Sequence, residues 1–153
     1  MIALVQRVSR ARVRVHEGEG AGHDESIARG VLVLLGVERG DAEHDIDWGA
    51  DKVANLRIFS DQDGKMNHSL RDVGGEAMVV SQFTLAGDAR KGNRPSFVNA
   101  AQPQHAAPLV ERFAQRLEHE HHLRVARGVF GAAMEVELVN EGPVTIIVQR
   151  DPV

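Results

Sequence analysis

The segment Ser81-Gln82-Phe83-Thr84-Leu85 places three hydrogen-bonding side chains in a run that is otherwise apolar. A polar group buried without a partner costs on the order of 1–3 kcal/mol, so a group of three indicates that something pairs with them. Thr84 is the side-chain nucleophile candidate, but its motif holds no histidine to serve as a base. The alternative is that these residues only finish a strand and satisfy neighbouring backbone groups.

A second segment, Asn140-Glu141-Gly142-Pro143-Val144-Thr145, contains a Gly-Pro pair. Proline removes a donor from a sheet ladder, and an X-Pro bond is cis in only about 5–6% of folded cases. Glycine and proline are also common in turns, so a plain hairpin explains the pair as well.

Arg7 and a basic stretch near residue 90 are two further candidates for the site. Arg7 shares strand parity with Val5 and Val13, which aims its guanidinium at the apolar face, where it needs partners. A β-bulge between Arg7 and Ala11 would instead return it to solvent. The stretch 89–97 combines three cations with Phe97, a set that can hold a phosphate and stack a base, or that simply forms a solvated loop.

The sequence does not predict a metal or a cofactor. It contains no cysteine, which removes thiolate nucleophiles and sulfur-rich zinc sites. His119, His121 and His122 lie where a helix is expected to end, without an acidic partner at ligand spacing. We interpret them as a solvated helix end.

Hydrophobic periodicity predicts the elements that must position these residues. We expect a single α/β domain over residues 1–153, with a sheet and two main helices. Asp41 is the expected N-cap of the first helix, and Pro103 or Pro108 the start of the second. The expected strands are 1–16, 31–37 (covered on both faces), 77–85, 134–138 and 144–149, and the expected helices are 42–57 and a second one containing 106–117.

Composition limits the class of protein. Hydrophobic residues make up 42% of the 153 residues, which is typical of a globular domain. The net charge is −4, which argues against a protein that coats long DNA or RNA but not against one that handles a nucleic-acid end. No apolar run reaches the roughly 18 residues of a membrane span, and no secretory signal is evident. We expect a cytoplasmic location.

Taken together, these segments resemble the D-aminoacyl-tRNA deacylase family from end to end. The first strand, residues 2–11, is similar to that of the family, as are 56–59, 64–67 and 94–97. The two motifs that define the family, SQFTL and GPVT, stand intact at 81–85 and 142–145. The resemblance implies a compact β-barrel-like α/β fold with an antiparallel and mixed sheet, assembled as a two-fold homodimer.

The resemblance also implies an activity and a site. Members hydrolyse the ester between a D-amino acid, or mischarged glycine, and the terminal adenosine of tRNA. Gly142 and Pro143, joined by a cis bond and braced by Arg7, would enter the partner's pocket and exclude L-amino acids. The residues assigned to catalysis are Ser81, Gln82, Phe83 and Thr84, and those assigned to substrate binding are Gly142, Pro143, Arg7, Met134, Phe97 and Arg94.

Three alternatives remain open on this basis. Hydrolysis can be assisted by the 2′-hydroxyl of the adenosine, with backbone N–H groups near Phe83 and Thr84 holding the oxyanion, or Thr84 can act directly. A related editing deacylase with a trans Gly-Pro bond would prefer a small L-amino acid. A non-catalytic protein that binds RNA ends could use the same scaffold.

Overall fold

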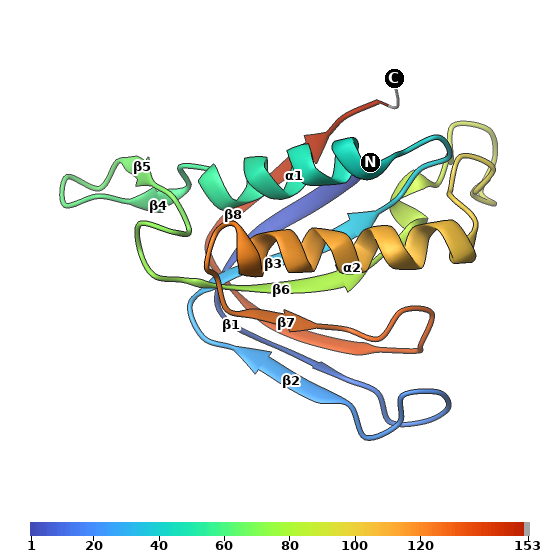
Figure 1. The fold of residues 1–153 in the computed structure, drawn as a ribbon, viewed down its shortest axis with the longest axis horizontal. Helices are drawn as coiled ribbons and strands as arrows, with labels where there is room; N and C mark the ends of the chain where they lie inside the picture. The colour runs from blue at the N-terminus through green and yellow to red at the C-terminus, as the bar shows by residue number, and fades with distance from the viewer. Residues whose placement is uncertain (152–153) are drawn as a thin grey trace.

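Six strands of the described chain form a mixed sheet that curls towards a barrel, with two helices lying across one face, and the two remaining strands pair separately (Figure 1). The computed structural model describes residues 1–151, and the fold is the expected single α/β domain. The elements are β1 (Ile2–Arg14), β2 (Asp24–Ile27), β3 (Gly30–Gly36), α1 (Glu43–Asn55), β4 (Phe59–Ser60), β5 (Met66–His68), β6 (Glu76–Ser81), the 3-10 turn η1 (Phe83–Ala86), α2 (Pro103–His119), β7 (Val125–Arg127) and β8 (Glu135–Gln149).

The sheet combines parallel and antiparallel pairing. Its order is β2-β1-β3-β6-β7, and β8 pairs with β1. β3, β6 and β7 run parallel, because α1 and α2 each carry the chain back across the sheet. All pairs made by β1 are antiparallel. The carboxyl ends of β3 and β6 therefore lie together at one edge, where ligands commonly bind in parallel sheets.

Two apolar clusters lie on opposite faces of the central strands. Val31, Val33 and Leu35 of β3 pack with residues of the helices, including Phe113, in the first cluster. Leu32 belongs to a second cluster, against which the first half of β8 packs. The prediction that 31–37 is covered on both faces is confirmed, and the unbroken apolar run follows from it.

The pairing of β1 with β8 is interrupted twice. Gln6 pairs with Thr145 and Val8 with Asn140, so residues 141–144 have no partner on β1. One step further, Val8 pairs with Asn140 and Arg10 with Val139, which makes Ser9 an extra residue on β1. This second irregularity is a β-bulge, and it exchanges the two faces of β1 for the residues that follow it.

Arg7 lies before this bulge and stays on the face of Val5, so the first interpretation of its parity is confirmed. The side chain is 11% exposed. Its Nε donates to the carbonyl of Glu141 at 2.9 Å, and its Nη1 donates to the carbonyl of Ile58 at 2.6 Å. The bulge exists as well, but it moves Ala11 and Val13 into the second cluster instead of returning Arg7 to solvent.

Both helices form, and the start of the first needs a correction. Ala42, not Asp41, is the N-cap of α1. Asp41 is buried, and its carboxylate accepts from the Met1 ammonium at 2.8 Å and from the Glu38 N–H at 2.6 Å, so it is not available as a cap. Pro103 occupies the first turn of α2, whereas Pro108 lies inside the helix. Neither helix, nor any other within residues 1–151, is long and apolar enough to cross a membrane.

The strand predicted over 77–85 ends early. β6 stops at Ser81, and the chain folds into η1 from Phe83 to Ala86. The prediction for 83–85 was wrong because the apolar residues there continue the pattern of the strand while the backbone turns. The Gln82 N–H still donates to Leu35 at 2.8 Å, and the turn begins with the bond from the Leu85 N–H to Gln82.

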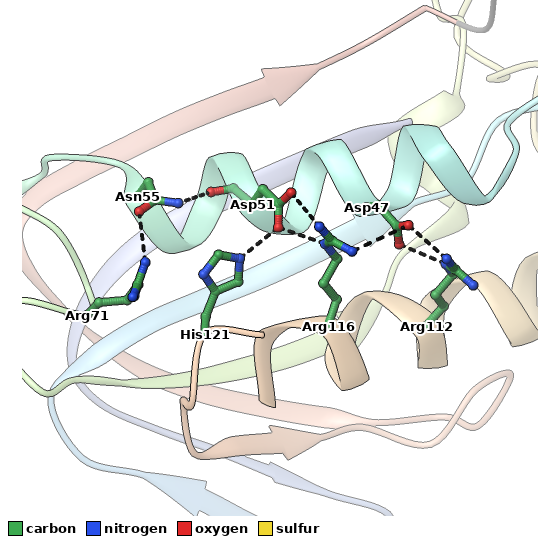
Figure 2. A network of polar contacts seen from close by, with 7 residues as sticks. All are labelled: Asp47, Asp51, Asn55, Arg71, Arg112, Arg116 and His121. Carbon is green, nitrogen blue, oxygen red and sulfur yellow. Dashed lines mark hydrogen bonds and ion pairs between the residues drawn. The ribbon is translucent and has the colours of Figure 1, made fainter. Parts of the chain in front are cut away.

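A ladder of ion pairs joins α1 to α2 (Figure 2). Arg112 binds both carboxylate oxygens of Asp47, at 2.7 and 2.8 Å, and Arg116 binds Asp51 with the same two distances. The His121 Nε2 lies 2.7 Å from Asp51. The solvated helix end expected for the histidines is thus wrong for His121, whose side chain is only 9% exposed. Its acidic partner comes from the other helix, a contact that spacing along the sequence does not show.

The ladder predicts acid sensitivity. Hydrogen bonds from Arg112 and Arg116 hold the pKa values of Asp47 and Asp51 below the ordinary value of 3.8 in the folded protein. The stability they add is therefore present above that value and is lost as pH falls through the folded-state pKa values. We expect the Asp47→Asn/Asp51→Asn variant to be about 1 kcal/mol less stable than the wild type at neutral pH. Urea unfolding as a function of pH checks this, and a constant difference down to strong acid would contradict it.

The bonds made by Arg7 predict a second effect. Arg7→Ala leaves the carbonyls of Glu141 and Ile58 without this donor, which should cost about 1–3 kcal/mol in the free energy of unfolding. Arg10→Ala is the matched control, because Arg10 is an exposed arginine on the same strand. Denaturant unfolding measures both variants. Equal stability of the two would contradict the assigned role of Arg7.

Candidate active site

A cavity of about 590 Å³ opens where β3 and β6 end. One wall comes from these strand ends and η1, a second from the start of α2, and a third from the segment that leads into β8. Ser81, Gln82, Phe83, Phe97 and Met134, five of the predicted site residues, lie in its lining. The lining is Leu35, Val37, Val80, Ser81, Gln82, Phe83, Phe97, Ala100, Ala101, Gln102, Pro103, Ala106, Val110, Phe130, Gly131, Ala132, Met134 and Val136.

The lining of this cavity is uncharged. Its polar side chains are the hydroxyl of Ser81 and the amides of Gln82 and Gln102. None of its residues from the described part of the chain is an aspartate, glutamate, histidine, lysine or arginine. A reaction in the cavity therefore has no lining side chain that can take or give a proton near neutral pH.

Gln82, which lines the cavity, forms a local pair with Thr84. The Nε2 of Gln82 donates to the hydroxyl of Thr84. Thr84 itself does not line the cavity, although it is exposed beside it. The bonds of η1 begin with the Leu85 N–H, so the N–H groups of Phe83 and Thr84 are not used within the turn. These are the two backbone donors proposed from the sequence.

Two aromatic rings form the mouth. Phe83 and Phe97 meet edge to face, with ring centroids 5.2 Å apart. They are 58% and 37% exposed, which is unusual for large apolar side chains and leaves their surfaces open to a ligand. Gly87 makes the arrangement possible, because a Cβ there would lie 2.9 Å from the ring of Phe97.

Met134 and Phe130 form the wall opposite the turn. The sulfur of Met134 accepts from the Val129 N–H at 3.4 Å, which fixes the side chain at the start of β8. Phe130 is 39% exposed and was missed from the sequence. The available signal was an aromatic residue between Gly128 and Gly131. Gln102, which precedes α2, was also missed and has no comparable signal.

Gly142 and Pro143 do not line the cavity of their own chain. Both are exposed, and they lie in the segment 141–144 that stands out of the β1–β8 pairing. The bond between them is cis. Gly142 has φ +129°, and a Cβ there would lie 3.0 Å from the Nη2 of Arg7. The part of β1 beside this segment pairs with the start of β3. Leu35 and the cavity lie at the other end of β3.

The loop after η1 carries the remaining predicted residue, Arg94. Arg94 is exposed and stands outside the lining, three positions before Phe97. In the same loop, the side chain of Arg90 holds Asp88 with two hydrogen bonds, of 2.9 and 2.6 Å, and lowers the pKa of Asp88 to about 2. Asp88 therefore stays charged at neutral pH and neutralises Arg90.

A second, larger cavity of about 720 Å³ lies at the opposite end of β6. Its lining includes Arg71, Glu76 and His121 but none of the residues predicted for the site. The smaller cavity is the better candidate because the polar motif and the exposed aromatic rings meet there. Within residues 1–151 no group of three histidine or acidic side chains is placed to hold a metal ion.

Comparison with known proteins places the chain in a family. The family model described as D-Tyr-tRNA(Tyr) deacylase matches residues 4–149. A D-aminoacyl-tRNA deacylase of Cytophaga hutchinsonii is 50% identical over 148 residues, covering 97% of this chain and 96% of that protein. One from Roseiflexus castenholzii is 55% identical over 147 residues, covering 96% and 90%.

Two solved structures share the fold. A c-Myc DNA Unwinding Element Binding Protein is 38% identical with a TM-score of 0.88, and 99% of each chain is covered. A probable eukaryotic D-amino acid tRNA deacylase has a TM-score of 0.81 at 17% identity, with 96% and 97% covered, a likeness of fold alone. The match over nearly the whole chain and the identities near one half show that this chain belongs to the D-aminoacyl-tRNA deacylase family and is a hydrolase.

Proposed function

We propose that the cavity beside η1 binds the aminoacylated terminal adenosine of tRNA and that the ester of a D-amino acid or of glycine is hydrolysed there. The uncharged lining is the observation that carries this proposal. A site that lacks a side-chain acid, base or metal suits a substrate that is already activated. An aminoacyl ester of a ribose is such a substrate, and it brings a neighbouring hydroxyl with it.

The reaction needs little from the protein beyond placement and charge stabilisation. The oxygen of a water molecule attacks the carbonyl carbon of the ester, and the bond from that carbon to the ribose oxygen then breaks. The ribose oxygen leaves with a proton, which the adjacent 2′-hydroxyl helps to deliver. In this proposal the N–H groups of Phe83 and Thr84, which make no bond within the turn, stabilise the oxyanion, a contribution worth about 3–4 kcal/mol for one donor in other hydrolases.

The segment that selects the D-amino acid comes from a second copy of the chain. Gly142 and Pro143 lie outside their own cavity and stand out from the sheet, so they reach a cavity only in a partner. We propose a two-fold homodimer in which this pair forms a wall of backbone. The wall leaves no room for the side chain of an L-amino acid, and it accepts a D side chain or the hydrogen of glycine.

The nucleic-acid partner that we propose is the end of a tRNA and not a long duplex. The net charge of −4 opposes binding along DNA, whereas a terminal nucleotide fits an uncharged cavity with exposed aromatic rings. We place the reaction in the cytoplasm, where aminoacyl-tRNA is made and used, and we propose no cofactor.

Replacement of Thr84 separates the two catalytic routes. If the 2′-hydroxyl assists, Thr84→Ala should retain kcat within about tenfold of the wild type, because only the contact with Gln82 is lost. Loss of a true nucleophile or base would lower kcat by about 10²-fold or more. Single-turnover deacylation of D-tyrosyl-tRNA measures this. A loss of that size in folded protein that still binds substrate would assign the step to Thr84.

Replacement of Pro143 tests the selecting wall. The wild type should hydrolyse D-tyrosyl-tRNA and spare L-tyrosyl-tRNA. Pro143→Ala frees a backbone whose φ the ring had fixed, so hydrolysis of the L ester should rise while that of the D ester changes less. Parallel time courses on both esters give the ratio. An unchanged ratio would show that Pro143 does not select, and a wild type that binds tRNA without cleaving either ester would favour the RNA-end-binding alternative.

A further inference from the structure

Three exposed cations lie on the two chain segments that adjoin the cavity, and none of them has an ion-pair partner among residues 1–151. Arg39 follows β3, and Lys91 and Arg94 lie in the loop after η1. Many other arginines of the chain are neutralised, as Arg90 is by Asp88 at 2.6 Å. Arg39, Lys91 and Arg94 form no ion pair with any residue of the described chain, 1–151. These two segments, which we call the border, thus carry three positive charges without a neutralising partner among the described residues, in a protein whose net charge is −4.

Backbone hydrogen bonds hold the two loops together. The Arg39 N–H donates to the carbonyl of Asn99 at 2.7 Å, and the Ala101 N–H donates to Val37 at 3.0 Å. Asp88 and Ser96 close the longer loop with a pair of bonds of 2.8 and 2.9 Å. Figure 1 shows the loop after η1 beside the segment that joins β3 to α1, at the end of the molecule away from the β4–β5 hairpin.

The same loop lines the cavity. Phe97, Ala100 and Ala101 belong both to the lining and to the segment that carries Lys91 and Arg94. The loop that carries Lys91 and Arg94 thus continues directly into the lining of the cavity. The cavity offers a phosphate no positive charge of its own, because its lining is uncharged.

We propose that Arg39, Lys91 and Arg94 form a docking surface for the phosphates of the tRNA acceptor end that precede the terminal adenosine. This rests on the proposed function, and it assigns affinity for the polynucleotide to the border and recognition of the aminoacyl group to the cavity. Contacts of this kind are independent of base sequence and depend on salt. Each one lost should make the slope of log affinity against log salt shallower by about 0.7–0.9.

The test compares two variants of equal charge. The border variant is Arg39→Gln/Lys91→Gln/Arg94→Gln. The control variant is Lys52→Gln/Lys65→Gln/Arg71→Gln, which removes three exposed cations that also have no carboxylate partner among residues 1–151. Each protein is assayed on D-tyrosyl-tRNA and on D-tyrosyl-adenosine, which carries the ester but no phosphate.

The border variant should lose roughly tenfold or more in kcat/KM on D-tyrosyl-tRNA, mainly through KM, with a salt slope shallower by about 2–3. Its kcat/KM on D-tyrosyl-adenosine should match the wild type, and the control variant should match the wild type on both. Replacing the three residues by the other cation, in Arg39→Lys/Lys91→Arg/Arg94→Lys, should restore most of the activity on tRNA.

Other results would overturn the docking surface. Equal losses in the border and control variants would mean a general effect of charge. An equal loss on D-tyrosyl-adenosine would mean a damaged cavity, and no loss on D-tyrosyl-tRNA would mean that the phosphates bind elsewhere. Binding of tRNA without an attached amino acid is measured separately for the three proteins. If the wild type cleaves neither ester, the proposed function fails. Weaker tRNA binding by the border variant alone would still support the docking surface in that case.

Discussion

The irregular pairing of β1 with β8 is the constraint on which the arrangement of the molecule depends. The first residues of β1 pack in the cluster under the helices, and its last residues pack in the second cluster. The extra residue Ser9 makes this exchange of faces possible within one strand. At the same place β8 releases residues 141–144, and Arg7 holds the released segment by the carbonyl of Glu141. Two adjacent irregularities therefore exchange the faces of β1 and release the segment that carries the Gly-Pro pair.

The cavity arises from the parallel half of the same sheet. β3 and β6 end together, and the turn η1 brings Phe83 and Thr84 to the strand ends, with backbone N–H groups that make no bond within the turn. The protein offers shape, aromatic surface and peptide dipoles there, all of which are fixed by the backbone. For a substrate with an activated ester, such fixed dipoles supply the kind of stabilisation that flexible charged side chains supply elsewhere. Family membership shows a hydrolase, and the uncharged lining is the basis of our proposal that much of the chemistry is left to the substrate.

The sequence predicted the fold well wherever a pattern repeats. Both helices and the buried strand 31–37 follow from periodicity, because burial on one or two faces imposes it. The end of β6 could not be found this way, since the apolar residues of η1 continue the strand pattern while the backbone turns. The role of Asp41 and the contact of His121 with Asp51 depend on residues distant in sequence. Of the two motifs on which the site prediction rests, the first lines the cavity and the second does not. Phe130 and Gln102 reach the cavity through the path of the chain before β8 and at the start of α2, which no motif indicates.

The uncharged lining has one more consequence. A pocket with ionisable groups in its lining has a titration curve of its own, and that curve limits the pH range in which the pocket works. The pocket between η1 and α2 has no such groups in its wall. The pH dependence of a reaction in this pocket is thus set by the ionisable groups of the bound substrate. The same protein would therefore show a different pH profile with each aminoacyl ester whose amino group has a different pKa.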